Sequence, residues 1–189
     1  MSDIEGRIGL LGAGRMGSAL AQGWLRKARG GISADDIILI DPRPGVGAQA
    51  LIETRGVAQA DALTPELART LGTLVVAIKP DQVRPVLSAL NDDLPLDALV
   101  ISIAAGVPLR TLSKALPDRP IVRAMPNTPA AIGEGMTVCV ANPIADTKLY
   151  EKRVERLLKP AGLVEWISDE RLMDAVTAVS GSGPAYVFL

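Results

Sequence analysis

The chain has 189 residues, of which 48% are hydrophobic and 3% aromatic, and its formal net charge is −1. This length fits one large domain, or one domain with a fragment of a second, and a nearly neutral charge argues against nucleic acid or an anionic membrane as a partner. The chain contains no histidine, which excludes histidine proton relays and histidine metal ligands, and we expect no metal site.

The first predicted unit is a strand, a glycine turn and a helix. Residues 7–17 form a short apolar run that ends in Gly-x-Gly-x-x-Gly, and apolar residues at helical spacing follow at once. Gly12 permits the sharp turn, Gly14 leaves room for a pyrophosphate, and Gly17 allows close packing of helix on strand. The N–H groups at the start of such a helix face the phosphates. The pattern predicts a dinucleotide site; a glycine turn without a ligand is the alternative.

Strands and helices then alternate along the chain. We expect strands over residues 37–40, 73–78, 99–103, 120–124, 135–141 and 163–167. Helices are expected over residues 45–55, 81–90, 109–116, 146–158 and 169–179. This order is typical of an α/β protein with a Rossmann-type, doubly wound and mostly parallel sheet and helices on both faces. The strands near residues 135 and 163 are candidates for antiparallel additions.

The last 21 residues differ from the rest. We assign residues 1–168 to a dinucleotide-binding domain, and residues 169–189 to a connecting helix, a hinge and the start of a helical domain. The sequence ends in an apolar run after Ser180-Gly-Ser-Gly-Pro184, so we expect a fragment cut where a second domain begins; a frayed terminal tail is the alternative.

Cysteine content and the distribution of apolar residues bear on the compartment. Cys139 is the single cysteine and lies in an apolar run, which predicts a buried structural thiol. The longest apolar stretch, residues 98–107, has about half of the ~20 residues that a membrane-spanning helix needs. The N-terminus also lacks a signal-peptide pattern. We therefore predict a cytoplasmic protein that does not enter a membrane.

The segment after the second strand contains two residues with opposite implications for the cofactor. Asp41 would accept hydrogen bonds from the adenosine ribose and favour NAD, whereas Arg43 would pair with a 2′-phosphate and favour NADP. The alternative interpretation is that Asp41 only begins a turn before Pro42, as aspartate often does. NADP and NAD both stay open, with NADPH slightly favoured.

Three further strand ends offer candidate contacts. Lys79 follows an apolar strand and is either a solvated charge or a contact to cofactor phosphate or ribose. The small residues around Ala105 would let a flat ring lie against backbone, or would serve packing only. In the loop of residues 123–129, two prolines flank Asn127 and Thr128. Asn127 would position a nicotinamide amide or a small carboxylate, or would stabilise a turn.

With these segments placed, the chain resembles pyrroline-5-carboxylate reductases. The resemblance spans nearly the whole chain and rests on five segments in the family's order. The segments are Gly12-Ala-Gly-Arg-Met-Gly17, Ala77-Ile-Lys-Pro80, Ser102-Ile-Ala-Ala-Gly106, Arg123-Ala-Met-Pro-Asn-Thr-Pro129 and Ser180-Gly-Ser-Gly-Pro-Ala-Tyr186. The glycine fingerprint is common to many families, and the last two segments are far more specific.

The resemblance implies an N-terminal Rossmann domain, a C-terminal helical domain that forms homo-oligomers, and reduction of 1-pyrroline-5-carboxylate to L-proline with NAD(P)H. It also implies a set of cofactor contacts. These would be Gly12, Gly14, Arg15, Met16 and Gly17 at the pyrophosphate, Asp41, Arg43 and Thr64 toward the adenosine, Ile78, Lys79, Pro80 and Ala105 along the cofactor, and Asn127 toward the nicotinamide. Residues 180–184 would form the hinge into the helical domain.

This sequence departs from the family pattern in three ways. Arg15 stands where the family commonly has asparagine or glutamine, and Thr64 stands where it often has asparagine. The family's Ser-Pro-Gly-Gly-Thr segment, which binds substrate, does not occur in the chain. We therefore name no catalytic residue and expect cofactor binding with little or no turnover. A reductase of the β-hydroxyacid dehydrogenase type and a non-catalytic nucleotide-binding module are the alternatives.

Overall fold

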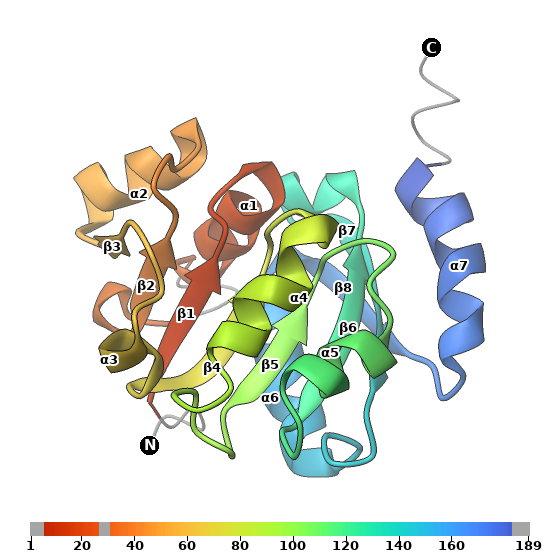
Figure 1. Cartoon of the computed structure of the whole chain (residues 1–189). Coiled ribbons are helices and arrows are strands. Elements are labelled where there is room, and N and C mark those ends of the chain that lie inside the picture. The colour runs from red at the N-terminus through yellow and green to blue at the C-terminus, as the bar shows by residue number, and fades with distance from the viewer. Residues whose placement is uncertain (1–5, 27–30, 183–189) are drawn as a thin grey trace.

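The structure is a computed structural model that describes residues 6–26 and 31–182 of the chain. Within these residues, eight strands form one sheet in the order β3-β2-β1-β4-β5-β6-β7-β8 (Figure 1). The strands are β1 (Arg7–Leu11), β2 (Ile37–Ile40), β3 (Ala58–Ala60), β4 (Leu71–Val76), β5 (Leu99–Ser102), β6 (Ile121–Pro126), β7 (Gly135–Ala141) and β8 (Gly162–Trp166). The predicted α/β class and mostly parallel sheet are confirmed.

The direction of the strands changes once. Strands β1 to β6 are mutually parallel, whereas β7 pairs with β6 in the antiparallel sense and β8 pairs with β7 in the parallel sense. Both carboxyl-terminal strands therefore run against the other six, which is the arrangement considered for the segments near residues 135 and 163. As a result, the ends of β1 to β6 and the starts of β7 and β8 share one edge of the sheet.

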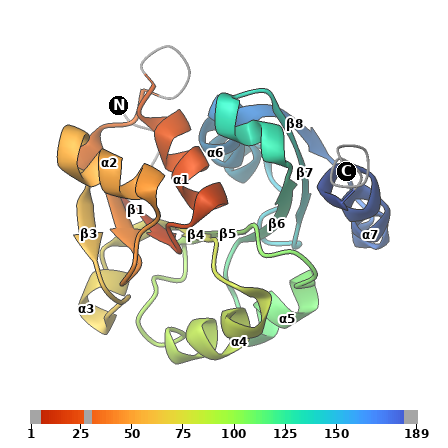
Figure 2. The same ribbon diagram turned by 90° about the horizontal axis from the view of Figure 1, so that it is seen from above.

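Helices cover both faces of the sheet, as predicted. The α-helices are α1 (Arg15–Trp24), α2 (Val46–Arg55), α3 (Pro65–Ala68), α4 (Pro80–Ala89), α5 (Leu109–Ala115), α6 (Lys148–Leu158) and α7 (Met173–Val176). Figure 2 shows α1, α2 and α6 on one side of the sheet and α3, α4 and α5 on the other. No helix in the described part of the chain is both long enough and apolar enough to span a membrane.

The core consists of one apolar layer on each face, because successive strand residues point to opposite sides. Ile8 and Leu10 of β1 pack with α1, α2 and α6, whereas Leu11 packs with the layer under α3, α4 and α5. Trp24 of α1 is fully buried, and its indole N–H donates to the carbonyl oxygen of Leu157 in α6 at 2.7 Å. This bond satisfies the polar atom of the largest buried side chain.

The predicted strands and α-helices match the observed ones to within a few residues, with two omissions and one correction. Strand β3 and helix α3 were not predicted, because three and four residues are too few to show a periodicity. The helix predicted over residues 169–179 is instead a 3-10 turn (Glu170–Leu172), α7, and a π-helical segment (Thr177–Ser182). Gly181 does not end it, since an interior glycine costs a helix only about 1 kcal/mol.

Two further expectations concern Cys139 and the carboxyl-terminal hinge. Cys139 is buried and free, as predicted, and burial raises the pKa of its thiol. The proposed hinge at residues 180–184 extends beyond the described residues, and the domain boundary at residue 168 stays a prediction.

Candidate cofactor site

The glycine turn between β1 and α1 has the tight geometry that its sequence predicts. Gly12 has a φ of 96°, and a Cβ there would lie 2.7 Å from the carbonyl carbon and oxygen of Ala77, directly after β4. A Cβ on Gly17 would overlap the carbonyl oxygen of Gly12. Both positions therefore require glycine: Gly12 for the left-handed backbone and Gly17 for the close approach of α1 to the turn.

Gly14 differs from both, because the space above it is open. Within the described residues, no neighbouring atom lies within 4 Å of the position that a Cβ would take there. Gly14 is also the N-cap of α1, and no side chain caps this helix. The first N–H groups of α1 are thus left without a side-chain acceptor, next to a free volume. This combination suits an anion, since unpaired N–H groups and the positive helix end both favour negative charge.

Asp41, directly after β2, is bonded to the glycine turn. Its Oδ2 accepts the N–H of Ala13 at 2.8 Å, and its Oδ1 accepts the N–H of Arg43 at 2.8 Å. The carboxylate thus begins the turn that leads into α2, which was one of the two roles considered for it. The Arg43 side chain is exposed, and the structure shows no ion pair for it within the described residues.

The other predicted residues occupy neighbouring strand ends at the same edge of the sheet. Ile78 is half-buried, and the exposed Lys79 and Pro80 cap and begin α4. Ala105 is exposed after β5. Asn127 is half-buried after β6, and its side-chain oxygen accepts the N–H of Met136 at 2.9 Å. Asn127 therefore stabilises its own turn, while its amide N–H₂ has no protein acceptor among the described residues.

Among the residues that the structure describes, Thr64 makes no hydrogen bond to the other predicted site residues. Its hydroxyl accepts the N–H of Leu67 at 3.3 Å and so caps α3. The turn after α3 bonds back to the start of β1, where the carbonyl oxygen of Thr70 accepts the N–H of Arg7. Figure 1 accordingly shows α3 toward the end of the sheet where β1 begins.

A hollow of about 410 Å³ adjoins the start of α1. Arg15, Met16 and Ala19 line it from α1, and Thr128 and Ala131 line it from the 3-10 helix Thr128–Ile132 that follows Asn127. The structure thus brings the glycine turn beside the proline-flanked loop, although more than a hundred residues separate them in the sequence. This hollow is where a group held by the turn would meet that loop.

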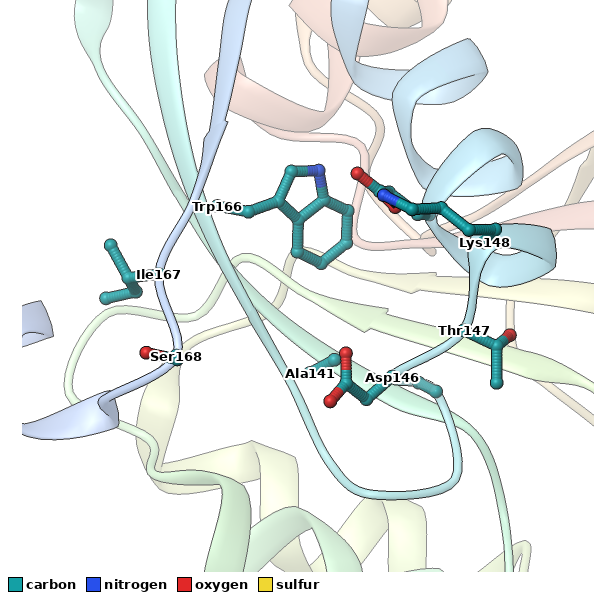
Figure 3. A pocket seen from close by; sticks show the side chains of 9 residues that line it. Ala141, Asp146, Thr147, Lys148, Trp166, Ile167 and Ser168 are labelled. Atoms are coloured by element: carbon teal, nitrogen blue, oxygen red, sulfur yellow. The ribbon is translucent and has the colours of Figure 1, made fainter.

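A second hollow of about 400 Å³ lies at the opposite edge of the sheet, where β7 and β8 end (Figure 3). Two of its charged groups pair with each other, since Lys148 Nζ lies 2.5 Å from Glu151 Oε2. Figure 3 shows the ring of Trp166 facing Lys148 across this space. It contains none of the predicted site residues. Sequence reasoning did not find this hollow, because it forms only where α6 packs beside β8.

Sequence reasoning also missed a link between the proline-flanked loop and the carboxyl-terminal helix. Glu170 Oε1 accepts a hydrogen bond from Arg123 Nη1 at 2.9 Å and another from the N–H of Leu109 at 2.7 Å. Arg123 is buried in β6, just before the loop, with a side-chain exposure of 6%. One carboxylate thus joins β6, the start of α5 and the segment that leads into α7. No spacing in the sequence indicates this contact.

The described residues contain no group of three or more cysteine or acidic side chains that could hold a metal. The candidate site thus consists of three features: an open anion site at the start of α1, the end of β2 with Asp41 and Arg43, and a hollow beside the loop that contains Asn127. These fit an extended dinucleotide across the edge of the sheet where β1 to β6 end.

Comparison with known proteins agrees with this geometry. Residues 7–106 match the family model described as NADP oxidoreductase coenzyme F420-dependent. A pyrroline-5-carboxylate reductase from Pseudomonas aeruginosa is 38% identical over 186 residues, which is 97% of this chain and 65% of that protein. The chain thus spans slightly less than two thirds of that relative's length.

Solved structures also show similarity to pyrroline-5-carboxylate reductases. A pyrroline-5-carboxylate reductase from Coxiella burnetii matches 97% of this chain and 67% of its own, with a TM-score of 0.84 and 31% identity. The Plasmodium falciparum pyrroline carboxylate reductase with NADP bound matches 98% of this chain and 66% of its own, with a TM-score of 0.82 and 31% identity. The chain therefore belongs to the pyrroline-5-carboxylate reductase family.

Proposed function

We propose that this chain is the cofactor-binding part of an enzyme that reduces 1-pyrroline-5-carboxylate to L-proline with NAD(P)H. The observation that carries the proposal is the open space above Gly14 at the uncapped start of α1, where a pyrophosphate would fit. Family membership supplies the reaction and the substrate. The cytoplasmic location and the homo-oligomeric state expected of the full-length protein stay predictions.

The predicted residues divide into groups along the edge of the sheet. Arg15 and Met16 would hold the pyrophosphate together with the three glycines, Gly12, Gly14 and Gly17. Asp41, Arg43 and Thr64 belong to the adenosine side of the proposed site. Ile78, Lys79, Pro80 and Ala105 would line the middle of the cofactor, and Asn127 would face the nicotinamide with its free amide N–H₂.

When bound, the reduced nicotinamide supplies the hydride that the C=N carbon of the substrate accepts. The chain's own contribution is orientation, because holding two reactants in a fixed geometry removes much of the entropic barrier. The stiff loop after β6 and the hollow beside α1 would fix the ring and exclude water from it. The imine nitrogen must also be protonated, and none of the predicted residues is assigned that role.

We further propose that NADPH is preferred over NADH. The exposed Arg43 side chain has no acidic partner among the described residues, so its charge is available for a 2′-phosphate. The NADP named in the Plasmodium falciparum structure supports this preference.

The proposal is tested by measuring binding and turnover separately. Titration with NADPH and NADH, followed by quenching of protein fluorescence, should show saturable binding by the 189-residue chain. Oxidation of NADPH with 1-pyrroline-5-carboxylate should be very slow with this chain and fast with a protein that spans the family's full length. Failure to bind either nucleotide at millimolar concentration would overturn the proposal. Fast turnover by the 189-residue chain would overturn its assignment to the cofactor-binding part.

A further inference from the structure

Asp41 occupies the position at which a ribose-binding carboxylate was expected, but both of its oxygens are already engaged by backbone. Oδ2 accepts the N–H of Ala13, and Oδ1 accepts the N–H of Arg43, each at 2.8 Å. The Asp41 backbone is held as well, since its N–H donates to the carbonyl oxygen of Ala60 and its carbonyl oxygen accepts from the Gln59 side chain, both at 3.0 Å. The side chain is therefore fixed from several directions.

The residue that the Asp41 carboxylate holds lies inside the glycine turn. Ala13 lies between Gly12 and Gly14, and its carbonyl oxygen accepts the N–H of Gly45 at 2.9 Å. A Cβ on Gly45 would approach that same oxygen to 3.2 Å, which shows how closely the two segments pack. The turn and the loop from β2 to α2 are thus joined at both backbone polar groups of one residue, Ala13.

From this arrangement we infer that Asp41 is a positioning residue that holds the glycine turn against the β2–α2 loop. We call its two hydrogen bonds, from the N–H groups of Ala13 and Arg43, the latch. Asp41 does not choose between NAD and NADP through the ribose. Hydrogen bonds from backbone N–H to a carboxylate are among the stronger ones in proteins. This pair holds the pyrophosphate turn and the backbone of Arg43 in register. The inference rests on the proposed nucleotide binding and adds the residue that organises the site.

The latch predicts a distinctive pattern of affinities. A ribose acceptor would matter more for NADH than for NADPH, because only NADH keeps the free 2′-hydroxyl. A latch matters equally for both, because both cofactors place the same pyrophosphate on the same turn. Loss of the latch should therefore raise both dissociation constants by the same factor and leave their ratio unchanged.

The experiment compares Asp41→Asn and Asp41→Ser with Asp61→Asn as a matched control. Asp61 is an exposed aspartate after the neighbouring strand, and its Oδ1 accepts from the Gln59 side chain. Fluorescence titration should show that Asp41→Asn weakens NADPH and NADH alike by about tenfold, since a charge-assisted hydrogen bond is lost. Asp61→Asn should leave both unchanged. A selective loss of NADH affinity in Asp41→Asn would overturn the latch.

A second readout does not depend on the cofactor. Amide hydrogen exchange, followed by NMR in the free chain, should accelerate at Ala13 and Arg43 in both Asp41 variants and stay unchanged at distant amides. Unchanged exchange at Ala13 would overturn the latch even if affinities fall. A chain that binds neither nucleotide would refute the proposed function, whereas the exchange measurement would still decide whether Asp41 holds the turn.

Discussion

The two ends of the sheet are held together in different ways. Around β1 and β2, contacts join neighbouring segments and involve backbone groups, such as the bond from the N–H of Gly12 to the carbonyl oxygen of Ile40 at 2.9 Å. Around β6 to β8, long side chains link distant segments: Arg123 contacts Glu170, 47 positions away. The backbone geometry of the first region can be predicted from short sequence motifs, whereas the contacts of the second region depend on how the whole chain packs.

The substitution with the largest expected effect lies where β7 and β8 pair. Gly162 has a φ of 141°, and a Cβ there would overlap the carbonyl oxygen of Gly135. We expect Gly162→Ala to lower the free energy of unfolding by about 4 kcal/mol or more, because strain and a backbone clash add. Urea denaturation measures this value.

Gly106→Ala is the matched control for Gly162→Ala. Gly106 has a φ of 73°, but no neighbouring atom in the part of the chain that the structure describes lies within 4 Å of its Cβ position. It should cost only about 1–2 kcal/mol, which is the usual penalty of a left-handed backbone. Equal losses in the two variants would show that contact between the strands is not what requires Gly162.

The next test removes the side-chain link of the carboxyl-terminal region. Glu170→Ala leaves the buried guanidinium of Arg123 without its carboxylate. We expect a loss of about 3 kcal/mol, at the low end for a broken buried pair, because Glu170 is partly exposed. Thermal and urea denaturation measure this loss.

Glu165→Ala, on the exposed side of β8, is the control for Glu170→Ala and should change stability by less than about 0.5 kcal/mol. Similar stability of the two variants would mean that the link contributes little. The two ends of the sheet would then differ in the kind of contact that they contain, but not in how much those contacts stabilise the fold.

The nucleotide-binding region is tested by separating affinity from stability. Gly14→Ala places a methyl group in the open space above the start of α1, so NADPH affinity should fall about a hundredfold, or about 2.7 kcal/mol. Stability should change by less than about 1 kcal/mol, since Gly14 packs against nothing there. Fluorescence titration and urea denaturation of the same protein measure the two effects.

Gly56→Ala should do the reverse of Gly14→Ala. Gly56 is the left-handed residue that ends α2, with open space around its Cβ position. It should lower stability by about 1 kcal/mol and leave affinity unchanged. If Gly14→Ala kept full affinity, the pyrophosphate would lie elsewhere.

These differences explain how far sequence reasoning reaches in this chain. The strands Ile37–Ile40 and Gly135–Ala141 were predicted with their observed bounds, because each is a continuous apolar run between clear turn signals. The roles of Gly12 and Gly17 follow from local geometry and were also predictable. The role of Asp41 could not be decided from the sequence, since an aspartate at this position is compatible both with a ribose acceptor and with a turn former. Its two hydrogen bonds appear only when β1 and β2 lie side by side.

Glu170 could not be predicted for a different reason. Its partners Arg123 and Leu109 come from separate elements, and no periodicity joins them. The short β3 and α3 were missed because hydrogen bonds to neighbours, and not hydrophobic pattern, define them. Sequence motifs therefore locate the site, whereas the packing that holds its far side emerges only from the assembled fold.

The smallest expected effect concerns Thr64, a side chain that acts locally, like the backbone contacts of the nucleotide-binding region. Its hydroxyl caps α3, so Thr64→Ala should cost about 0.5–1 kcal/mol, whereas Thr64→Ser should cost less. The same pair tests the proposed adenosine contact, because NADPH affinity should fall in Thr64→Ala and be kept in Thr64→Ser. Unchanged affinity in both variants would remove Thr64 from the cofactor site.

The pH dependence of the Thr64→Ala effect follows from Glu66 in the same turn. The pKa of Glu66 is lowered, first by a hydrogen bond from its own backbone N–H and then by one from the Thr64 hydroxyl. The charged form of Glu66 therefore stabilises the fold fully at pH values above the pKa that Glu66 has in the unfolded chain. This contribution is lost as the pH falls through the lowered pKa of the folded state. Thr64→Ala removes one of the two donors, so its cost should be larger at about pH 7 than at about pH 3. An equal cost at both pH values, measured by urea denaturation, would show that Thr64 acts on the helix N–H groups alone.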